Sequence, residues 1–159
     1  MTGKKTKIIL HAEDDPAHAA IIRMVIELSA VTIQLMQVED GKEALDYLYR
    51  QESFADPAVS PRPDLVLLDL RMPRIDGLGV LAAVKKDPAL KAIPVVMLTT
   101  SASEKDRSEA QSCGADDYLT KPVNFDEFVN MMEELCATWL GAIWEGRKAT
   151  DPPGHLVCR

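Results

Sequence analysis

Two kinds of hydrophobic pattern alternate along the chain. Short apolar runs, which are typical of buried strands, are separated by longer segments in which apolar residues recur every three or four positions, as on one face of a helix. The runs predict strands at 7–12, 31–38, 64–69, 93–98 and 117–120. The periodic segments predict helices at 16–28, 41–50, 78–86, 104–112 and from 124 onward.

The order of these elements predicts an α/β fold. Parallel strands joined by right-handed helical crossovers form one five-stranded sheet with helices on both faces. The alternation fits the flavodoxin-like strand order 2-1-3-4-5, which is our expectation, although alternation alone does not fix the order. We expect this domain to span 6–140, with a tail at 1–5 and an extension at 141–159 that ends in a disordered segment.

Residues 51–62 follow neither pattern. The segment contains two prolines, two serines and an aspartate, and it is long for a connection between a helix and a strand. Such a segment is either a contact surface or a tolerated insertion, of which the insertion is the more frequent case.

The most informative stretch is 63–77. The apolar run Leu65–Leu68 ends in Asp69, and Pro73 and then Asp76-Gly77 turn the chain toward the next helix. A carboxylate at the end of a buried strand is costly unless it is paired or binds a metal. Ligands of open α/β sheets bind at the carboxyl ends of the strands, so Asp69 is either part of a site or the cap of a loop.

Other strands of the predicted sheet also end in polar residues. Strands one, four and five end at Glu13-Asp14, Thr99 and Lys121. Clustered carboxylates repel one another unless a cation joins them, and a set of oxygen ligands suits Mg²⁺. An aspartate beside such an ion can attack phosphorus and form an acyl phosphate, with a lysine and a hydroxyl as partners of the phosphoryl oxygens. The strand ends therefore predict magnesium-dependent phosphoryl chemistry.

Four motifs in register resemble the receiver domain of two-component response regulators. They are Glu13-Asp14-Asp15-Pro16, Asp69-Leu70-Arg71-Met72-Pro73 with Asp76-Gly77, Thr99 after an apolar strand, and Tyr118-Leu119-Thr120-Lys121-Pro122. The resemblance covers about residues 5–140. It implies that a sensor histidine kinase transfers a phosphoryl group to Asp69.

The resemblance also implies roles for single residues. Binding of Mg²⁺ is implied for Asp14, Asp69, the backbone carbonyl of Arg71 and, directly or through water, Glu13. Switching is implied for Thr99 and Tyr118, and contact with the phosphate for Lys121. In this family the bond between Lys121 and Pro122 is often cis.

Some positions depart from the commonest family pattern. Glu13 stands where many members have aspartate, which favours a water-mediated role. Arg71 is expected beside the phosphate, where it would change the lifetime of the phosphoryl group, and Thr100 is expected to narrow the entrance. At His11, where a small aliphatic residue is usual, we expect a buried neutral imidazole rather than a pH sensor.

The last predicted helix carries an apolar stripe as far as Ile143. The domain needs only the first part of this helix, so Trp139, Leu140, Ile143 and Trp144 are expected to run past the sheet edge and form a dimer interface. Packing back on the same domain is the alternative.

The long segment before strand three and this tail are similar to those of the small single-domain regulators that partner bacterial phytochrome kinases. The narrower resemblance implies a homodimer in phytochrome light signalling. A kinase with a different sensor fits the sequence equally well.

Composition narrows the class of partner. A net charge of −7 argues against direct binding of nucleic acid, because phosphates are bound by a positive field. No apolar run reaches the roughly 18 residues of a membrane span. Cys113, Cys136 and Cys158 match no metal-ligand spacing, so we expect reduced thiols in a cytoplasmic protein with no membrane partner.

These observations predict a phosphorylation-operated signalling switch that catalyses only its own phosphorylation and dephosphorylation. The competing enzyme class is an aspartyl-phosphate phosphohydrolase, which usually needs a second aspartate where this chain has Arg71. A nucleotide-binding protein is disfavoured because the chain has no Gly-rich phosphate loop. A scaffold that has lost phosphotransfer is disfavoured because Asp14, Asp69, Thr99 and Lys121 are all present.

Overall fold

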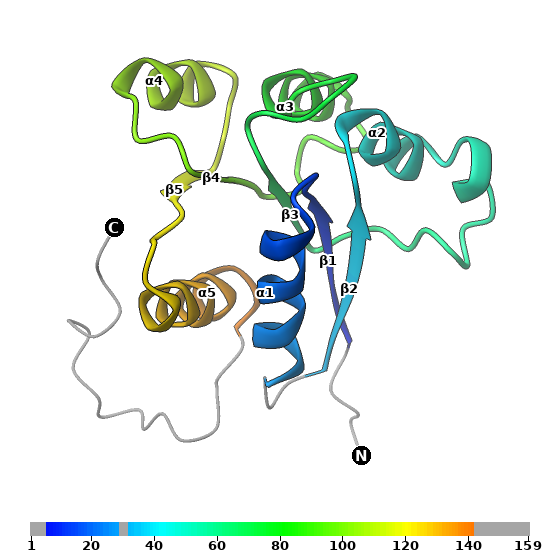
Figure 1. The fold of residues 1–159 in the computed structure, drawn as a ribbon. Coiled ribbons are helices and arrows are strands. Elements are labelled where there is room, and N and C mark those ends of the chain that lie inside the picture. Colours follow the sequence, from blue (N-terminus) through cyan, green and yellow to red (C-terminus); the bar gives the residue numbers. More distant parts are fainter. Residues whose placement is uncertain (1–5, 29–31, 142–159) are drawn as a thin grey trace.

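A computed structural model describes residues 6–28 and 32–141 of the 159-residue chain. Strands and helices alternate along it, as Figure 1 shows. The strands are β1 (Lys7–Ala12), β2 (Ile33–Val38), β3 (Leu65–Leu68), β4 (Val95–Thr99) and β5 (Asp117–Thr120). The helices are α1 (Pro16–Glu27), α2 (Gly41–Tyr49), α3 (Gly77–Lys86), α4 (Glu104–Ser112) and α5 (Phe125–Leu140), with a short 3-10 helix at Glu52–Phe54.

The strands form one parallel sheet in the order β2-β1-β3-β4-β5, which confirms the flavodoxin-like order. Helices α1 and α5 cover one face, and α2, α3 and α4 cover the other (Figure 1). Each face has its own apolar core, because alternate residues of a strand point to opposite sides. On β1, for example, Leu10 belongs to the core under α2 and α3, whereas Ile9 packs under α1 and α5.

Helix starts follow the capping chemistry of the sequence. Asp15 caps α1 by accepting from the Ala17 amide, and Pro16 occupies the first turn, where its missing N–H is not needed. Ser103 accepts from the Asp106 amide at the start of α4. Gly114 follows α4 with a φ of 98°, a conformation that glycine adopts readily after a helix end.

Strand β4 differs from its expected range, because it begins at Val95 rather than Ile93. The Ile93 amide closes a turn onto the Leu90 carbonyl, and Pro94 has no N–H to donate to a neighbouring strand. Only the Pro94 carbonyl takes part in pairing, as acceptor from the Val66 amide. The apolar run therefore started two residues before the strand did.

The tail also differs from its expectation. Helix α5 ends at Leu140, and Gly141 caps it in the left-handed conformation with a φ of 67°. Leu140 is only 7% exposed and lies in the core under α1, so the expectation that it projects uncovered past the sheet was wrong. Ile143 and Trp144 lie outside the described residues, as does Cys158.

Segment 51–62 is fixed to the end of α2 by hydrogen bonds. The Tyr47 hydroxyl donates to the Pro61 carbonyl at 2.6 Å, and the Arg50 guanidinium donates to the Ser60 carbonyl. The buried Ser60 hydroxyl in turn donates to the Phe54 carbonyl at 2.9 Å. The segment therefore packs as part of the domain.

Within the part of the chain that the structure describes, no helix is long and apolar enough to cross a membrane.

Candidate functional site

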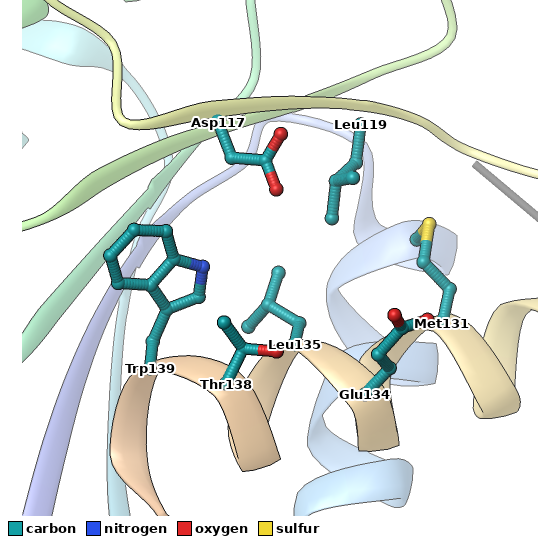
Figure 2. Close-up of a pocket in the computed structure, with 7 residues that line it drawn as sticks. All are labelled: Asp117, Leu119, Met131, Glu134, Leu135, Thr138 and Trp139. Atoms are coloured by element: carbon teal, nitrogen blue, oxygen red, sulfur yellow. The ribbon is translucent and has the colours of Figure 1, made fainter. Parts of the chain in front are cut away.

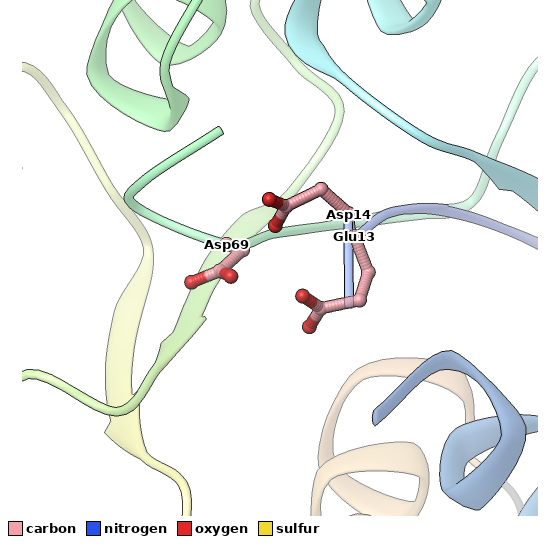
Figure 3. Close-up of side chains that lie close together, drawn as sticks. All are labelled: Glu13, Asp14 and Asp69. Atoms are coloured by element: carbon pink, nitrogen blue, oxygen red, sulfur yellow. The ribbon is translucent and has the colours of Figure 1, made fainter. Parts of the chain in front are cut away.

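Three carboxylates meet at the carboxyl edge of the sheet. Glu13 and Asp14 follow β1, Asp69 follows β3, and one oxygen from each lies within 4.8 Å of the others. Figure 3 shows the three side chains close together. Parallel pairing brings them together, because the Asp69 amide donates to the carbonyl of Ala12, the last residue of β1. The sequence thus supplied the residues, and strand pairing made the cluster.

Lys121 brings positive charge to this cluster from the end of β5. Its side chain is 3% exposed, and its ammonium donates a short hydrogen bond to Glu13 Oε1. The same nitrogen lies 3.7 Å from Asp69 Oδ2. One ammonium faces three carboxylates, so the cluster keeps an excess of negative charge. The bond between Lys121 and Pro122 is trans, in contrast to the cis form that is frequent in the resembling family.

Burial raises the pKa of Glu13 to about 7, and the neighbouring Asp69 carboxylate acts in the same direction, whereas Lys121 opposes both. Glu13 is almost fully buried, Asp69 is half-buried and Asp14 is exposed. A set of carboxylates with too little positive charge beside it, in which every donor atom is a hard oxygen, fits a divalent cation such as Mg²⁺.

Thr99 and Tyr118 are both buried, and Ser101 connects them. The Ser101 amide donates to the Thr99 hydroxyl at 3.3 Å, and the Tyr118 hydroxyl donates to the Ser101 carbonyl at 3.0 Å. The Arg107 guanidinium lies 4.8 Å above the Tyr118 ring. The loop after β4 is therefore tied to both predicted switch residues.

The Arg71 side chain contacts helix α4. Its side chain is 76% exposed and forms an ion pair at 3.0 Å with Asp106 on α4. The Asp106 carboxylate also accepts from the Ser101 hydroxyl. The Arg71 guanidinium is thus engaged by a carboxylate on another element, and its place beside the phosphate stays a prediction.

His18 is a site residue that the sequence reading missed. It lies in the first turn of α1, and its Nδ1 is 3.0 Å from the ammonium of Lys121. The signal was available: the helix begins at Pro16, directly after the acidic residues that follow β1, so its first turn must lie over the same sheet edge. A histidine there is within reach of a strand-end cluster.

A separate small groove lies between β5 and α5 (Figure 2). It is lined by Asp117, Leu119, Met131, Glu134, Leu135, Thr138 and Trp139, none of which belongs to the carboxylate cluster. The Trp139 ring closes one end of the groove in Figure 2. Trp139 is thus partly buried against its own domain rather than free of it.

Comparison with known proteins agrees with this geometry. The family model described as the response regulator receiver domain matches residues 9–133. The probable methanogenesis regulatory protein FilR2 of Methanothrix harundinacea is 42% identical over 84% of this chain and 84% of its own length. The response regulator Rcp1 of Synechocystis sp. is 37% identical over 86% of this chain and 91% of its own length.

Two solved structures of similar chains bear on the site. The phosphorylated cyanobacterial phytochrome response regulator RcpA is 36% identical, with a TM-score of 0.81, and the match covers 89% of this chain and all of that one. The Mn²⁺-bound form of Rcp1 is 36% identical, with a TM-score of 0.77, and the match covers 89% of this chain and 97% of that one.

Proposed function

Because the chain belongs to the response regulator receiver family, we propose that it accepts a phosphoryl group from a sensor histidine kinase onto Asp69 and thereby switches a protein-binding surface. The observation that carries this proposal is the carboxylate cluster at the strand ends, with Lys121 beside Asp69.

The phosphoacceptor step follows from the chemistry of Asp69. A carboxylate oxygen attacks phosphorus, the phosphorus–nitrogen bond of the kinase phosphohistidine breaks, and the bond electrons return to the imidazole, leaving an acyl phosphate. Transfer of this kind needs positioning and neutralisation of charge more than proton transfer. The Lys121 ammonium supplies one positive charge 3.7 Å from Asp69, and the buried Thr99 hydroxyl serves as a donor to the transferred group.

We assign Mg²⁺ to the cluster as the resident cation, held by Asp14, Asp69, the backbone carbonyl of Arg71 and Glu13, directly or through water. When bound, a divalent ion supplies the charge that stabilises the oxygens of the transferring phosphoryl group. Glu13 supports the assignment. Burial raises the pKa of its carboxyl group, and a cation beside it would favour the charged form. The Mn²⁺-bound form of Rcp1 supports a divalent ion in a similar chain.

The switching step is assigned to Thr99 and Tyr118. A new dianion on Asp69 attracts the Thr99 hydroxyl, and Thr99 is bonded to the Ser101 amide. Ser101 in turn accepts from the Tyr118 hydroxyl, so movement of Thr99 is transmitted to Tyr118. The phosphoryl group thereby favours one of two arrangements of the loop after β4 and of the face made by α4, β5 and α5.

The partner is a histidine kinase. The similarity of this chain to RcpA and Rcp1 supports a kinase of the phytochrome type. Apolar side chains exposed directly after Lys121, those of Val123 and Phe125, support a docking protein. A net charge of −7 supports a protein rather than nucleic acid as direct partner, in a cytoplasmic setting where such kinases present their phosphohistidine.

We also propose that two copies of the chain associate through the tail. Trp139, at the end of the groove between β5 and α5, supports this, together with the apolar Ile143 and Trp144 that follow Gly141 in sequence. The domain thus comprises 6–140, and the extension from 141 serves assembly.

The proposal is tested by intact mass spectrometry after incubation with acetyl phosphate. One phosphoryl group is expected on the wild type with Mg²⁺, none without a divalent ion, and none on Asp69→Asn. Absence of the phosphoryl group, together with no binding of beryllofluoride to the wild type, would contradict the proposal. If Asp69→Asn is phosphorylated as much as the wild type, another residue is the acceptor.

The competing phosphohydrolase class is not favoured by the site. Those enzymes place an acid/base aspartate two residues after the nucleophile, and the side chain there, Arg71, is engaged by Asp106. A small phosphate ester offered to the wild type should therefore not be turned over catalytically. Acetyl phosphate, in contrast, should phosphorylate the protein itself.

A further inference from the structure

The ammonium of Lys121 is held by two residues of the segment that follows β1. It donates to Glu13 Oε1 and also contacts His18 Nδ1 at 3.0 Å. Asp69 Oδ2, at 3.7 Å, is beyond direct hydrogen-bond length. Of the three N–H donors of the lysine, two are therefore engaged by Glu13 and His18, and one remains for a group bound at Asp69.

The contact with Lys121 sets the role of His18 Nδ1. A lysine ammonium only donates, so Nδ1 accepts in this contact, which requires the tautomer whose proton is on Nε2. The ring is held in place because it lies in the first turn of α1, which begins at Pro16 and is capped by Asp15. Its side chain is 28% exposed, so the ring lies between the buried ammonium and the surface.

Glu13 has two competing demands on its carboxylate. It accepts from Lys121, and it belongs to the three-carboxylate cluster with Asp14 and Asp69. An oxygen of Glu13 that turns toward a cation weakens its hold on the lysine. His18 is not a member of that cluster, although Nδ1 lies 3.9 Å from Glu13 Oε1, so its acceptor atom stays available to Lys121 when the cluster binds a cation.

We propose that His18 is a positioning residue for phosphoryl transfer, which accepts a hydrogen bond from Lys121 through Nδ1 and keeps the ammonium aimed at Asp69. This inference rests on the proposed function, because Lys121 matters there as the partner of the phosphoryl group. Without His18, the buried ammonium moves with Glu13 toward the cluster and no longer points at Asp69.

The test compares two substitutions of similar size. In His18→Asn the amide oxygen replaces Nδ1 as acceptor, whereas His18→Leu removes the acceptor and keeps the bulk. Phosphorylation by acetyl phosphate is followed by mass spectrometry at saturating Mg²⁺. Loss of a hydrogen bond to a charged group predicts a roughly tenfold slower reaction for His18→Leu, and His18→Asn should stay within about threefold of the wild type.

A second comparison separates positioning from general stability. In the Lys121→Met background, His18→Leu should cause no further loss of rate, because His18 acts only through the lysine. Equal rates for His18→Leu and wild type, equal losses for His18→Leu and His18→Asn, or an undiminished loss in the Lys121→Met background would each overturn the inference.

A measurement on the unmodified chain guards against a variant that fails to fold. Long-range nitrogen–carbon correlation spectra of the histidine rings should show the His18 ring with its proton on Nε2 and a hydrogen-bonded Nδ1. A proton on Nδ1 would overturn the inference. A wild type that is neither phosphorylated nor able to bind beryllofluoride would instead contradict the proposed function itself.

Discussion

His11 is the more deeply buried of the two histidines in the described part of the chain. It lies near the carboxyl end of β1, 1% exposed, and the Gln37 amide contacts its Nδ1 at 3.1 Å. Burial, with smaller contributions from Lys121, His18 and Arg23, lowers the pKa of His11 to about 3. The folded protein therefore keeps this imidazole neutral at any pH at which it functions, which agrees with the neutral histidine expected from the sequence.

The lowered pKa predicts acid sensitivity of the fold. Below the ordinary histidine pKa of 6.5, the unfolded chain binds a proton at His11 that the folded chain does not bind. The free energy of unfolding is therefore highest above that pH and decreases as the pH falls toward 3. Between pH 6.5 and 4.5 this costs roughly 2–3 kcal/mol. Urea unfolding of wild type and His11→Leu should show the wild type losing that much more stability over this range. Parallel pH profiles for the two proteins would contradict the prediction.

Gly77 shows how closely the backbone packs behind Asp69. A Cβ added at Gly77 would lie 2.2 Å from the Asp69 carbonyl oxygen and 2.8 Å from Met97 Cε. By contrast, a Cβ at Gly79 would meet side-chain atoms alone, Ile75 Cγ2 at 2.8 Å and Asp76 Oδ1 at 3.5 Å, and no backbone atom. Gly77 is therefore required by a contact with the backbone of Asp69, the proposed phosphoacceptor.

We expect Gly77→Ala to destabilise the fold by about 1–3 kcal/mol, as overpacking does, and to slow phosphorylation because the Asp69 backbone is displaced. Gly79→Ala is the matched control, in an exposed helical position where alanine is favoured by about 0.5–1 kcal/mol. Chemical unfolding and acetyl phosphate assays on both variants make the comparison. Equal effects of the two substitutions would show that the contact with Asp69 is unimportant.

At the scale of elements, the loop after β3 and helix α4 are joined through Asp106. Its carboxylate accepts from the exposed Arg71 guanidinium and from the Ser101 hydroxyl, and Ser101 belongs to the loop that contacts Thr99. The two interactions differ in strength, because an exposed ion pair is worth about 0–1 kcal/mol and is screened by water and salt. A half-buried carboxylate that orders a loop contributes more.

Asp106→Ala should therefore cost about 1–2 kcal/mol of unfolding free energy, since it removes the acceptor of the Ser101 hydroxyl, whereas Arg71→Met should cost less than about 1 kcal/mol. Hydrogen exchange at 101–106 should accelerate in Asp106→Ala and change little in Arg71→Met. If Arg71→Met loosens this loop as much as Asp106→Ala does, the ion pair rather than the serine contact holds it.

At the scale of the whole molecule, two cores on opposite faces of the sheet share a single functional edge. The core under α2, α3 and α4 contains Tyr118, and the core under α1 and α5 contains Leu140. A change at the edge can therefore be transmitted to either face through side chains that are already packed. Leu140 contributes to the stability of one molecule, whereas the proposal assigns assembly to the residues after Gly141.

This division predicts opposite effects for two substitutions in the tail. Leu140→Ala removes a buried side chain and should cost about 2–5 kcal/mol of unfolding free energy. Trp144→Ala should leave stability within about 0.5 kcal/mol and shift sedimentation from dimer to monomer. Sedimentation and unfolding of both variants test this. A dimer that is unaffected by Trp144→Ala would place the interface elsewhere.

The sequence by itself determined the element order, most helix starts and the residues at the strand ends. These follow from local chemistry: apolar periodicity, Asp15 and Ser103 as caps, and Asp69 at the end of an apolar run. The ranges of α4 and β5 agree with the expected ones for the same reason. Where a local feature was overlooked, as at Pro94, the boundary moved by two residues.

Only the tertiary structure decided the partners of these residues. Strand pairing set the 4.8 Å grouping of Glu13, Asp14 and Asp69, and the packing of α1 brought His18 to Lys121. The direction of Arg71 and the burial of Leu140 were likewise settled by residues distant in sequence. Local patterns specify the chemistry that a residue carries, but its charge state and contacts depend on which other segments fold against it.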